Sequence, residues 1–87
     1  MYNLIPYVEE YHFDDFPYAS WYQGMYKDGY RSGIGKFDGK NFYYIGEVDD
    51  SPNGNGTEYL SKKYLYIGEW KNGKRHGRGL YINFVDG

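Results

Sequence analysis

The clearest folding signals of the chain lie between Tyr66 and Gly79, in the segment YIGEWKNGKRHGRG. Its first five residues alternate large side chains with small or polar ones, which is typical of a pleated strand. Asn72-Gly73 then gives the strongest short-range signal for a β-hairpin, because both residues tolerate positive φ. Gly77 and Gly79 follow at strand period two. Glycine weakens a strand, so we expect these two to leave room for an aromatic ring from a neighbouring strand.

Two further stretches of the chain resemble this one. Gly24, Gly46 and Gly68 recur at a constant spacing of 22 residues, and a tyrosine stands two residues before each of them. Each stretch closes with a Gly-x-Gly pair, at residues 33–35, 54–56 and 77–79. Repetition at this period indicates an array of units, none of which buries its apolar face alone. We therefore predict repeats at about residues 21–43, 44–63 and 64–87.

The pattern Tyr-x-Gly-Glu-Trp-x-x-Gly-x-x-His-Gly-x-Gly at 66–79 is similar to the MORN (membrane occupation and recognition nexus) repeat. The first repeat lacks the Glu and carries Ser32 where His is usual. The second has Val48 at the aromatic position, a rewritten turn at 49–53, and a glycine pair one residue early. The resemblance covers about residues 21–87. It implies an all-β fold in which three tandem β-hairpins stack into one elongated, twisted antiparallel sheet.

Residues 1–20 stand outside the repeats and have a different composition. They hold four of the chain's twelve acidic residues and none of its ten lysines and arginines. Pro6 and Pro17 argue against a long helix, and the many aromatic residues argue against simple disorder. We interpret this stretch as an acidic aromatic arm that caps the first repeat and covers an open sheet edge. The alternative is an arm that reaches for a partner.

Composition restricts both the kind of core and the kind of function. Aromatic residues make up 23 % of the chain, with 13 tyrosines, so we expect a core of stacked rings rather than branched aliphatics. A net charge of −2 gives no electrostatic case for nucleic acid. The chain has no cysteine, which excludes disulfides and cysteine metal sites. With no spanning apolar run and no signal peptide, we predict an intracellular protein, cytoplasmic or within a large assembly, neither secreted nor transmembrane.

No motif in the chain predicts catalysis, a cofactor or a metal. The segment from Gly68 to Lys74 has P-loop spacing, but Arg75 replaces the required Ser or Thr and the segment is predicted to be a hairpin. The adjacent acidic pairs point to opposite faces of an extended chain and do not converge. Glu47 and Glu69 recur at equivalent positions, which indicates a structural hydrogen bond or a cross-strand ion pair. We therefore predict that the protein is not an enzyme.

A basic cluster surrounds the last hairpin turn, and includes Lys74, Arg75 and Arg78. Its charges could meet an acidic protein patch or anionic lipid. The resemblance to MORN proteins implies a scaffold or docking role, with phospholipid contact in some members. We predict a non-catalytic structural and protein-interaction module, a scaffold subunit of a larger assembly. The alternative is a peripheral module that binds anionic phospholipid at a membrane surface.

The predicted partners are other protein chains in a larger assembly, or further copies of this chain joined through the sheet ends. Weak contact with anionic lipid is compatible with the basic cluster, whereas nucleic acid is not expected. The candidate partner-binding residues are the aromatic residues of the arm and of the repeats together with the basic cluster. They are Tyr7, Tyr11, Phe13, Phe16, Tyr22, Tyr44, Tyr66, Trp70, Lys74, Arg75 and Arg78.

Overall fold

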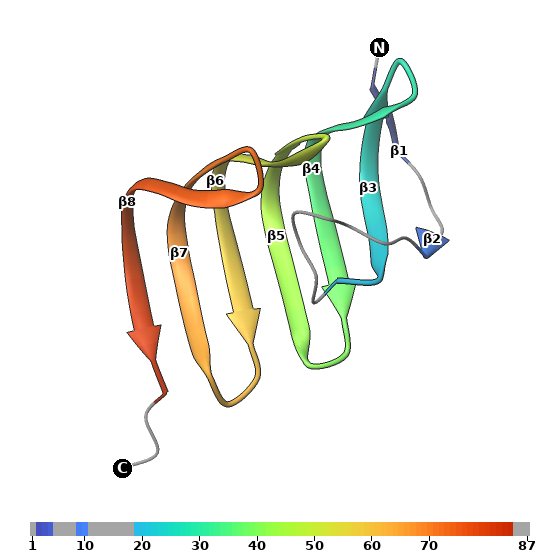
Figure 1. Ribbon diagram of the computed structural model, residues 1–87. Helices are drawn as coiled ribbons and strands as arrows, with labels where there is room; N and C mark the ends of the chain where they lie inside the picture. The colour runs from blue at the N-terminus through green and yellow to red at the C-terminus, as the bar shows by residue number, and fades with distance from the viewer. Residues whose placement is uncertain (1, 5–8, 11–18, 85–87) are drawn as a thin grey trace.

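The computed structural model describes residues 2–4, 9–10 and 19–84, and folds them into one antiparallel sheet (Figure 1). Six long strands follow one another in chain order, and two short ones pair with the outer edge of β3. The described residues contain no helix. The fold is all-β, as predicted. The strands are β1 (Tyr2–Leu4), β2 (Glu9–Glu10), β3 (Trp21–Lys27), β4 (Tyr30–Gly39), β5 (Phe42–Asp49), β6 (Ser51–Leu60), β7 (Tyr64–Lys71) and β8 (Lys74–Asn83).

The six long strands form three hairpins that stand side by side along the sheet (Figure 1). Turn chemistry determines two of their tips, one of which is the predicted Asn72-Gly73 turn. Asp28 and Gly29 have φ of 52° and 84°, and Asn72 and Gly73 have φ of 52° and 80°. Positive φ at both central residues is the signature of the type I′ turn, whose twist matches that of the flanking strands.

Two local features depart from simple sequence rules. Asp-Gly is a common turn pair, but Asp38 and Gly39 both belong to β4, and the turn into the second hairpin is formed by Lys40 and Asn41. Asn41 takes the positive φ, 65°, because a short amide side chain tolerates it. Pro52 falls in the stretch 49–53 that the sequence analysis describes as a turn, but it is buried in β6 opposite Val48. Proline is tolerated there because it lies near the start of its strand, next to the turn.

A row of glycines crosses the whole sheet, one from each long strand. Each is the register partner of the next, in the order Gly24, Gly35, Gly46, Gly56, Gly68 and Gly79. Cross-strand neighbours on one face interact directly, so a continuous glycine row leaves a shallow trough in the sheet. The trough gives room for large side chains from the same face.

Three tyrosine rings fill this trough, one from each hairpin. A Cβ atom added at Gly35, Gly56 or Gly79 would overlap the ring of Tyr22, Tyr44 or Tyr66, respectively. Each ring comes from the neighbouring strand, as the glycine spacing predicts. Each hydroxyl also donates to the carbonyl three residues on: Tyr22 to Met25 at 3.0 Å, Tyr44 to Glu47 at 2.6 Å and Tyr66 to Glu69 at 3.0 Å. The hydrogen bond satisfies the phenol group of a ring that is otherwise buried.

Glu47 and Glu69, the recurring glutamates, each lie at a β-bulge in the first strand of their hairpin. The strand register shifts at Glu47 and again at Glu69, which marks a β-bulge at each position. Glu47 Oε2 accepts a hydrogen bond of 2.7 Å from the Asn55 amide, and Glu69 Oε2 accepts one of 3.2 Å from the Arg78 amide. The predicted structural hydrogen bond is thereby confirmed. Met25 takes the same place in the first hairpin and has no carboxylate to offer.

This difference between hairpins suggests a substitution taken from the chain itself. We expect Glu47→Met to lower the free energy of unfolding by about 1–2 kcal/mol, because the Asn55 amide loses a charged acceptor. Glu47→Gln keeps an acceptor oxygen and serves as the matched control, with a smaller loss. Urea denaturation followed by tryptophan fluorescence measures both. Equal midpoints for Glu47→Met and the unmodified protein would contradict a structural role for this carboxylate.

Successive hairpins are also joined at their tips. The Gly73 amide donates to the Pro52 carbonyl at 3.0 Å, and the Asn72 amide to Asn53 Oδ1 at 3.0 Å. Trp70 extends from the third hairpin over the second, where its indole Nε1 donates to the Gly56 carbonyl at 3.1 Å. These bonds fix the distance and the angle between the second and third hairpins.

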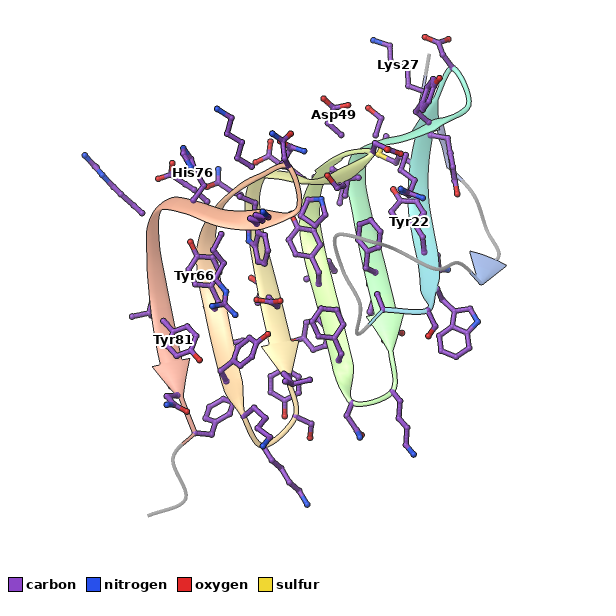
Figure 2. The ribbon with its side chains drawn as sticks, in the orientation of Figure 1. Tyr22, Lys27, Asp49, Tyr66, His76 and Tyr81 are labelled. Atoms are coloured by element: carbon purple, nitrogen blue, oxygen red, sulfur yellow. The ribbon has the colours of Figure 1, made fainter. Side chains whose placement is uncertain are left out.

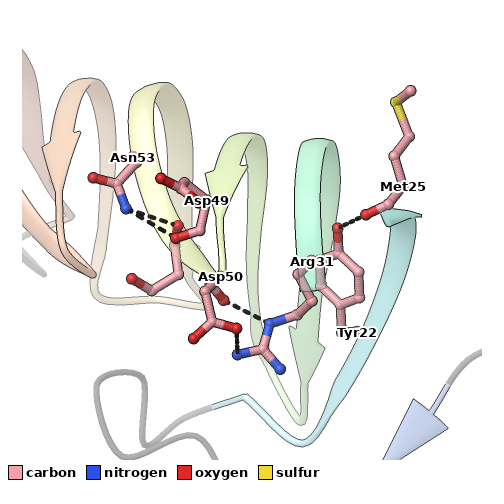
Figure 3. A network of polar contacts seen from close by, with 7 residues as sticks. Tyr22, Met25, Arg31, Asp49, Asp50 and Asn53 are labelled. Atoms are coloured by element: carbon pink, nitrogen blue, oxygen red, sulfur yellow. Dashed lines mark hydrogen bonds and ion pairs between the residues drawn. The ribbon is translucent and has the colours of Figure 1, made fainter. Parts of the chain in front are cut away.

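An ion pair joins the first two hairpins at the same level (Figure 3). Arg31 Nε donates to the Asp50 carbonyl at 2.6 Å, and its Nη2 lies 3.0 Å from Asp50 Oδ1. The same guanidinium lies 5.8 Å from the ring centre of Tyr22 and 5.5 Å from that of Phe37. Arg31 therefore ties the second tip to the aromatic core of the first hairpin through charge, hydrogen bonding and cation–π contact.

Candidate functional site

One face of the sheet, here called the core face, holds the rings of the chain itself (Figure 2). Four predicted partner-binding residues lie there: Tyr22 and Tyr44 are 0 % exposed, Tyr66 is 6 % and Trp70 is 4 %. Their rings meet edge to face, with 5.1 Å between the centres of Tyr44 and Trp70 and 5.5 Å between those of Tyr66 and Trp70. The structure thus places these four inside the fold, because the glycine trough holds the three tyrosine rings and Trp70 packs against two of them.

The environment of the buried phenols follows from this packing. Burial raises the pKa of Tyr22 to about 12, although Arg31 nearby opposes the change. Burial, and after it the negative charge of Glu47, raises the pKa of Tyr44 as well. Burial and then Glu58 raise the pKa of Tyr64 to about 12. All three therefore stay neutral hydrogen-bond donors at physiological pH, and none is poised to exchange a proton.

The opposite face, here called the open face, carries an exposed apolar row. Ile45, Thr57, Ile67 and Leu80 are successive register partners across β5 to β8. Ile45 is 48 % exposed, Ile67 46 % and Leu80 57 %. A shallow hollow of about 290 Å³ lies on this row, with Ile45, Thr57 and Ile67 in its lining.

A second row runs beside the first and extends the apolar surface. It consists of Tyr43, Tyr59, Leu65 and Ile82, again register partners in sequence. The rings of Tyr43 and Tyr59 lie 5.3 Å apart, and Ile82 is 40 % exposed. None of the residues in the two rows is among the predicted partner-binding residues. The signal in the sequence was the strand parity opposite to that of the tyrosines, to which Ile45 and Ile67 belong, next to Gly46 and Gly68.

The predicted basic cluster lies at the third hairpin tip, near His76 in Figure 2. Lys71, Lys74 and Arg75 line a wide hollow there of about 450 Å³, together with Asn72 and His76. The structure therefore brings together Lys74 and Arg75 from the predicted set. Arg78 is exposed in the same strand but does not line the hollow.

Arg75 has a structural role within this cluster. Its Nε lies 3.0 Å from Glu58 Oε1, a carboxylate in a residue only 5 % exposed. Its guanidinium also lies 4.7 Å from the ring centre of Tyr64 and 5.1 Å from that of Tyr81. A buried carboxylate needs such a partner, since an unpaired charge in that position would be strongly unfavourable. Lys71 and Lys74 are thus the charges of the hollow best placed to meet a ligand.

The outer edge of β8 closes the described part of the sheet without a further strand. All ten residues of β8 are exposed. At the other end, β1 and β2 pair antiparallel with β3, with Asn3 opposite Tyr26 and Glu9 opposite Tyr22. The arm residues predicted to contact a partner, Tyr7, Tyr11, Phe13 and Phe16, lie outside the described residues.

The fold belongs to the class of tandem β-hairpin repeats. Its core consists of aromatic rings packed on glycines, and the opposite face of the sheet is apolar and exposed. The family model of the MORN repeat matches residues 22–41 and 66–83. These segments coincide with the first and third hairpins, so these two hairpins match the MORN repeat in sequence as well as in structure. The middle hairpin repeats the same tyrosine and bulge geometry outside the matched segments. A count of three MORN repeats stays a prediction.

One curated relative shares part of this sequence. It is described as inactive protein tyrosine kinase pTKL from Plasmodium berghei (strain Anka), and it is 37 % identical over 46 residues. The match covers 51 % of this chain but 4 % of that protein. The chain thus spans a small fraction of its relative's length. Among the described residues, no helix has the length and hydropathy needed to cross a membrane.

Proposed function

We propose that the protein is a non-catalytic protein-interaction module that serves as a structural subunit of a larger assembly. The observation that carries this proposal is the apolar open face. Exposed apolar residues are ordinary when scattered, but contiguous patches of them mark interaction sites. Here two adjacent rows, from Ile45 to Leu80 and from Tyr43 to Ile82, cover the face across four strands.

The composition of the open face suits a protein partner. Aromatic and aliphatic residues dominate the centre of interfaces, and charged residues are depleted there. In this sheet Glu47, Glu69 and Arg78 lie towards the hairpin tips, and their positions border the row of Ile45 and Ile67. A shallow hollow at the centre of such a row offers a pocket for one apolar side chain. On the core face, the rings of the described residues already fill the trough.

The match of two hairpins to the MORN repeat supports an interaction module in general terms. The name of the relative adds one point, because it refers to an inactive kinase. Neither observation identifies a partner. The scaffold role proposed here therefore depends on the open face, and an absence of catalysis is part of the same proposal.

Photo-cross-linking in the native cell tests the proposal. A photoreactive residue replaces Ile45 or Ile67 in the full chain, and a third version carries it at Lys62, an exposed turn position away from the row. We expect one and the same protein to cross-link from positions 45 and 67, and not from 62. Ile45→Asp should then remove cross-linking from position 67 while leaving the urea midpoint nearly unchanged, since the side chain is exposed. Equal cross-linking from all three positions, or no effect of Ile45→Asp, would contradict the proposal.

The basic hollow at the third tip favours a second candidate, contact with anionic phospholipid. Each lysine near a negatively charged surface contributes about 1 kcal/mol, so Lys71 and Lys74 alone give weak binding. The net charge of −2 opposes it further. Sedimentation with phosphatidylserine vesicles at physiological salt separates the two candidates. Strong binding that is lost in Lys71→Gln/Lys74→Gln would favour the membrane module over the protein module.

A further inference from the structure

The contacts between hairpins form a docking pattern that the chain uses twice. When β5 adds to β4, Gly46 pairs with Gly35 and Val48 lies opposite Gly33. When β7 adds to β6, Gly68 pairs with Gly56 and Trp70 lies opposite Gly54. Gly33 and Gly54 have φ of 76° and 100°, a conformation that favours glycine. Each incoming strand thus sets a glycine on the glycine row and a bulky side chain against a positive-φ glycine.

The outer edge of β8 presents the receiving half of this pattern. Gly79 continues the glycine row, and Gly77, with φ of 64°, takes the place of Gly54. Arg75 is the second residue of β8, as Pro52 is the second residue of β6. In β6 this position accepts the turn of the following hairpin, because the Pro52 carbonyl accepts a hydrogen bond from the Gly73 amide. An exposed edge of ten residues offers its backbone groups to an added strand.

The first long strand, β3, carries the incoming half. Gly24 precedes Gly68 by two repeat periods, and Tyr26 stands where Trp70 stands in β7. The type I′ turn at Asp28-Gly29 matches that at Asn72-Gly73 in both of its positive φ angles. A strand built like β7 is therefore present at the other end of the same molecule.

We propose that β8 receives β3 of a second copy, so that copies associate head to tail and continue the sheet. This inference rests on the proposed interaction function and names one partner, a further copy of this chain. Translating the register of β6 and β7 onto the new pair sets Gly24 opposite Gly79, Tyr26 opposite Gly77 and Trp21 opposite Ile82. Trp21 is 39 % exposed and Ile82 40 %, so the contact would cover two side chains that are exposed in one copy.

The two short strands at the other end set the condition for this association. β1 and β2 pair with the edge of β3 that the incoming geometry needs free, through three and two register partners. The pairing of β6 with β7 uses seven register partners over a continuous strand. Short, interrupted edge strands are a known means of blunting a sheet edge. The arm therefore competes with the second copy, and association depends on protein concentration.

Sedimentation velocity on the full chain, over a range of concentrations, tests the proposal in three steps. First, the arm is weakened by prolines, which remove backbone donors from its pairing with β3: Asn3→Pro, Leu4→Pro, Glu9→Pro and Glu10→Pro. We expect the association constant to rise by about tenfold or more in this arm variant. Second, Ile82→Glu in the arm variant should return it to monomer, because a charge would face the Trp21 ring. Third, adding Trp21→Lys should restore association through an opposite-charge pair.

Two controls make the outcome specific. Ile45→Asp lies on the open face away from both edges and should leave head-to-tail association unchanged. Matching urea midpoints establish that Ile82→Glu and Trp21→Lys remain folded. Association that Ile82→Glu does not reduce, or that the Trp21→Lys pair does not restore, overturns the inference, as does an arm variant that stays monomeric. None of these results bears on cross-linking from Ile67, so failure of the inference and failure of the proposed function can be told apart.

Discussion

Replacement of Gly56 by valine is expected to lower the free energy of unfolding by about 2–4 kcal/mol. Gly56 lies in the middle of the glycine row, and a Cβ atom there would overlap the ring of Tyr44. That ring is 0 % exposed and is held by the hydrogen bond from its hydroxyl to the Glu47 carbonyl at 2.6 Å. It cannot move away without breaking this bond or leaving the core. Urea denaturation monitored by tryptophan fluorescence measures the loss.

The matched control for this prediction is the next residue of the same strand. Thr57→Val introduces the same side chain into β6, but on the open face, where the row of Ile45 and Ile67 is accessible to solvent. We expect a change within about 0.5 kcal/mol. If both valines cost the same, the penalty belongs to the strand rather than to the ring on the glycine, and the account of the trough is wrong.

Removal of the ring itself gives the second large effect. Tyr44→Ala should cost about 3–5 kcal/mol, because a fully buried aromatic side chain is lost together with its contact to Trp70, 5.1 Å away between ring centres. The sharper test is a double-mutant cycle with Gly56→Ala, a smaller change that keeps the chain folded. Once the ring is absent, the three atoms nearest to the added methyl group are removed, since all of them belong to Tyr44.

The cycle has a definite expected result. Gly56→Ala should destabilise the protein with Tyr44 present and have little effect, below about 0.5 kcal/mol, in the Tyr44→Ala background. The interaction free energy is then of the order of 1–2 kcal/mol, a value typical of residues in direct contact. Additive effects of the two substitutions would show that ring and glycine are independent. The same cycle can be repeated with Tyr66 and Gly79 in the third hairpin, where the overlap recurs.

Much of the fold could be predicted because its determinants are local. The turn at Asn72-Gly73 follows from two residues that accept positive φ, and the strands around it follow from period-two alternation. The packed stripe of β7, which includes Tyr66 and Trp70, follows from the same alternation. Turns and strands of this kind are predictable because their residue types favour one backbone conformation.

The candidate site was predicted less completely. Lys74 and Arg75 were placed together at the last hairpin tip, as the structure has them. Tyr22 and Tyr44 were named as contact residues on the ground of aromatic content, but content does not distinguish a packed ring from an exposed one. Whether a ring is packed or exposed depends on which strand lies next to it in the sheet. Glu58, likewise, has no local partner, and its ion pair with Arg75 arises across an intervening strand.

The repeating hairpins, their spacing of 22 residues and the packing of rings on glycine were predictable from the sequence, because every repeat carries its own turn and strand signals. Which face of the sheet is open depends on tertiary structure. Register pairing between strands aligned Ile45, Thr57, Ile67 and Leu80 into one row, and the glycine trough on the other side took up the rings. A continuous surface of this kind exists only when separate strands are placed side by side, so no single stretch of the chain encodes it.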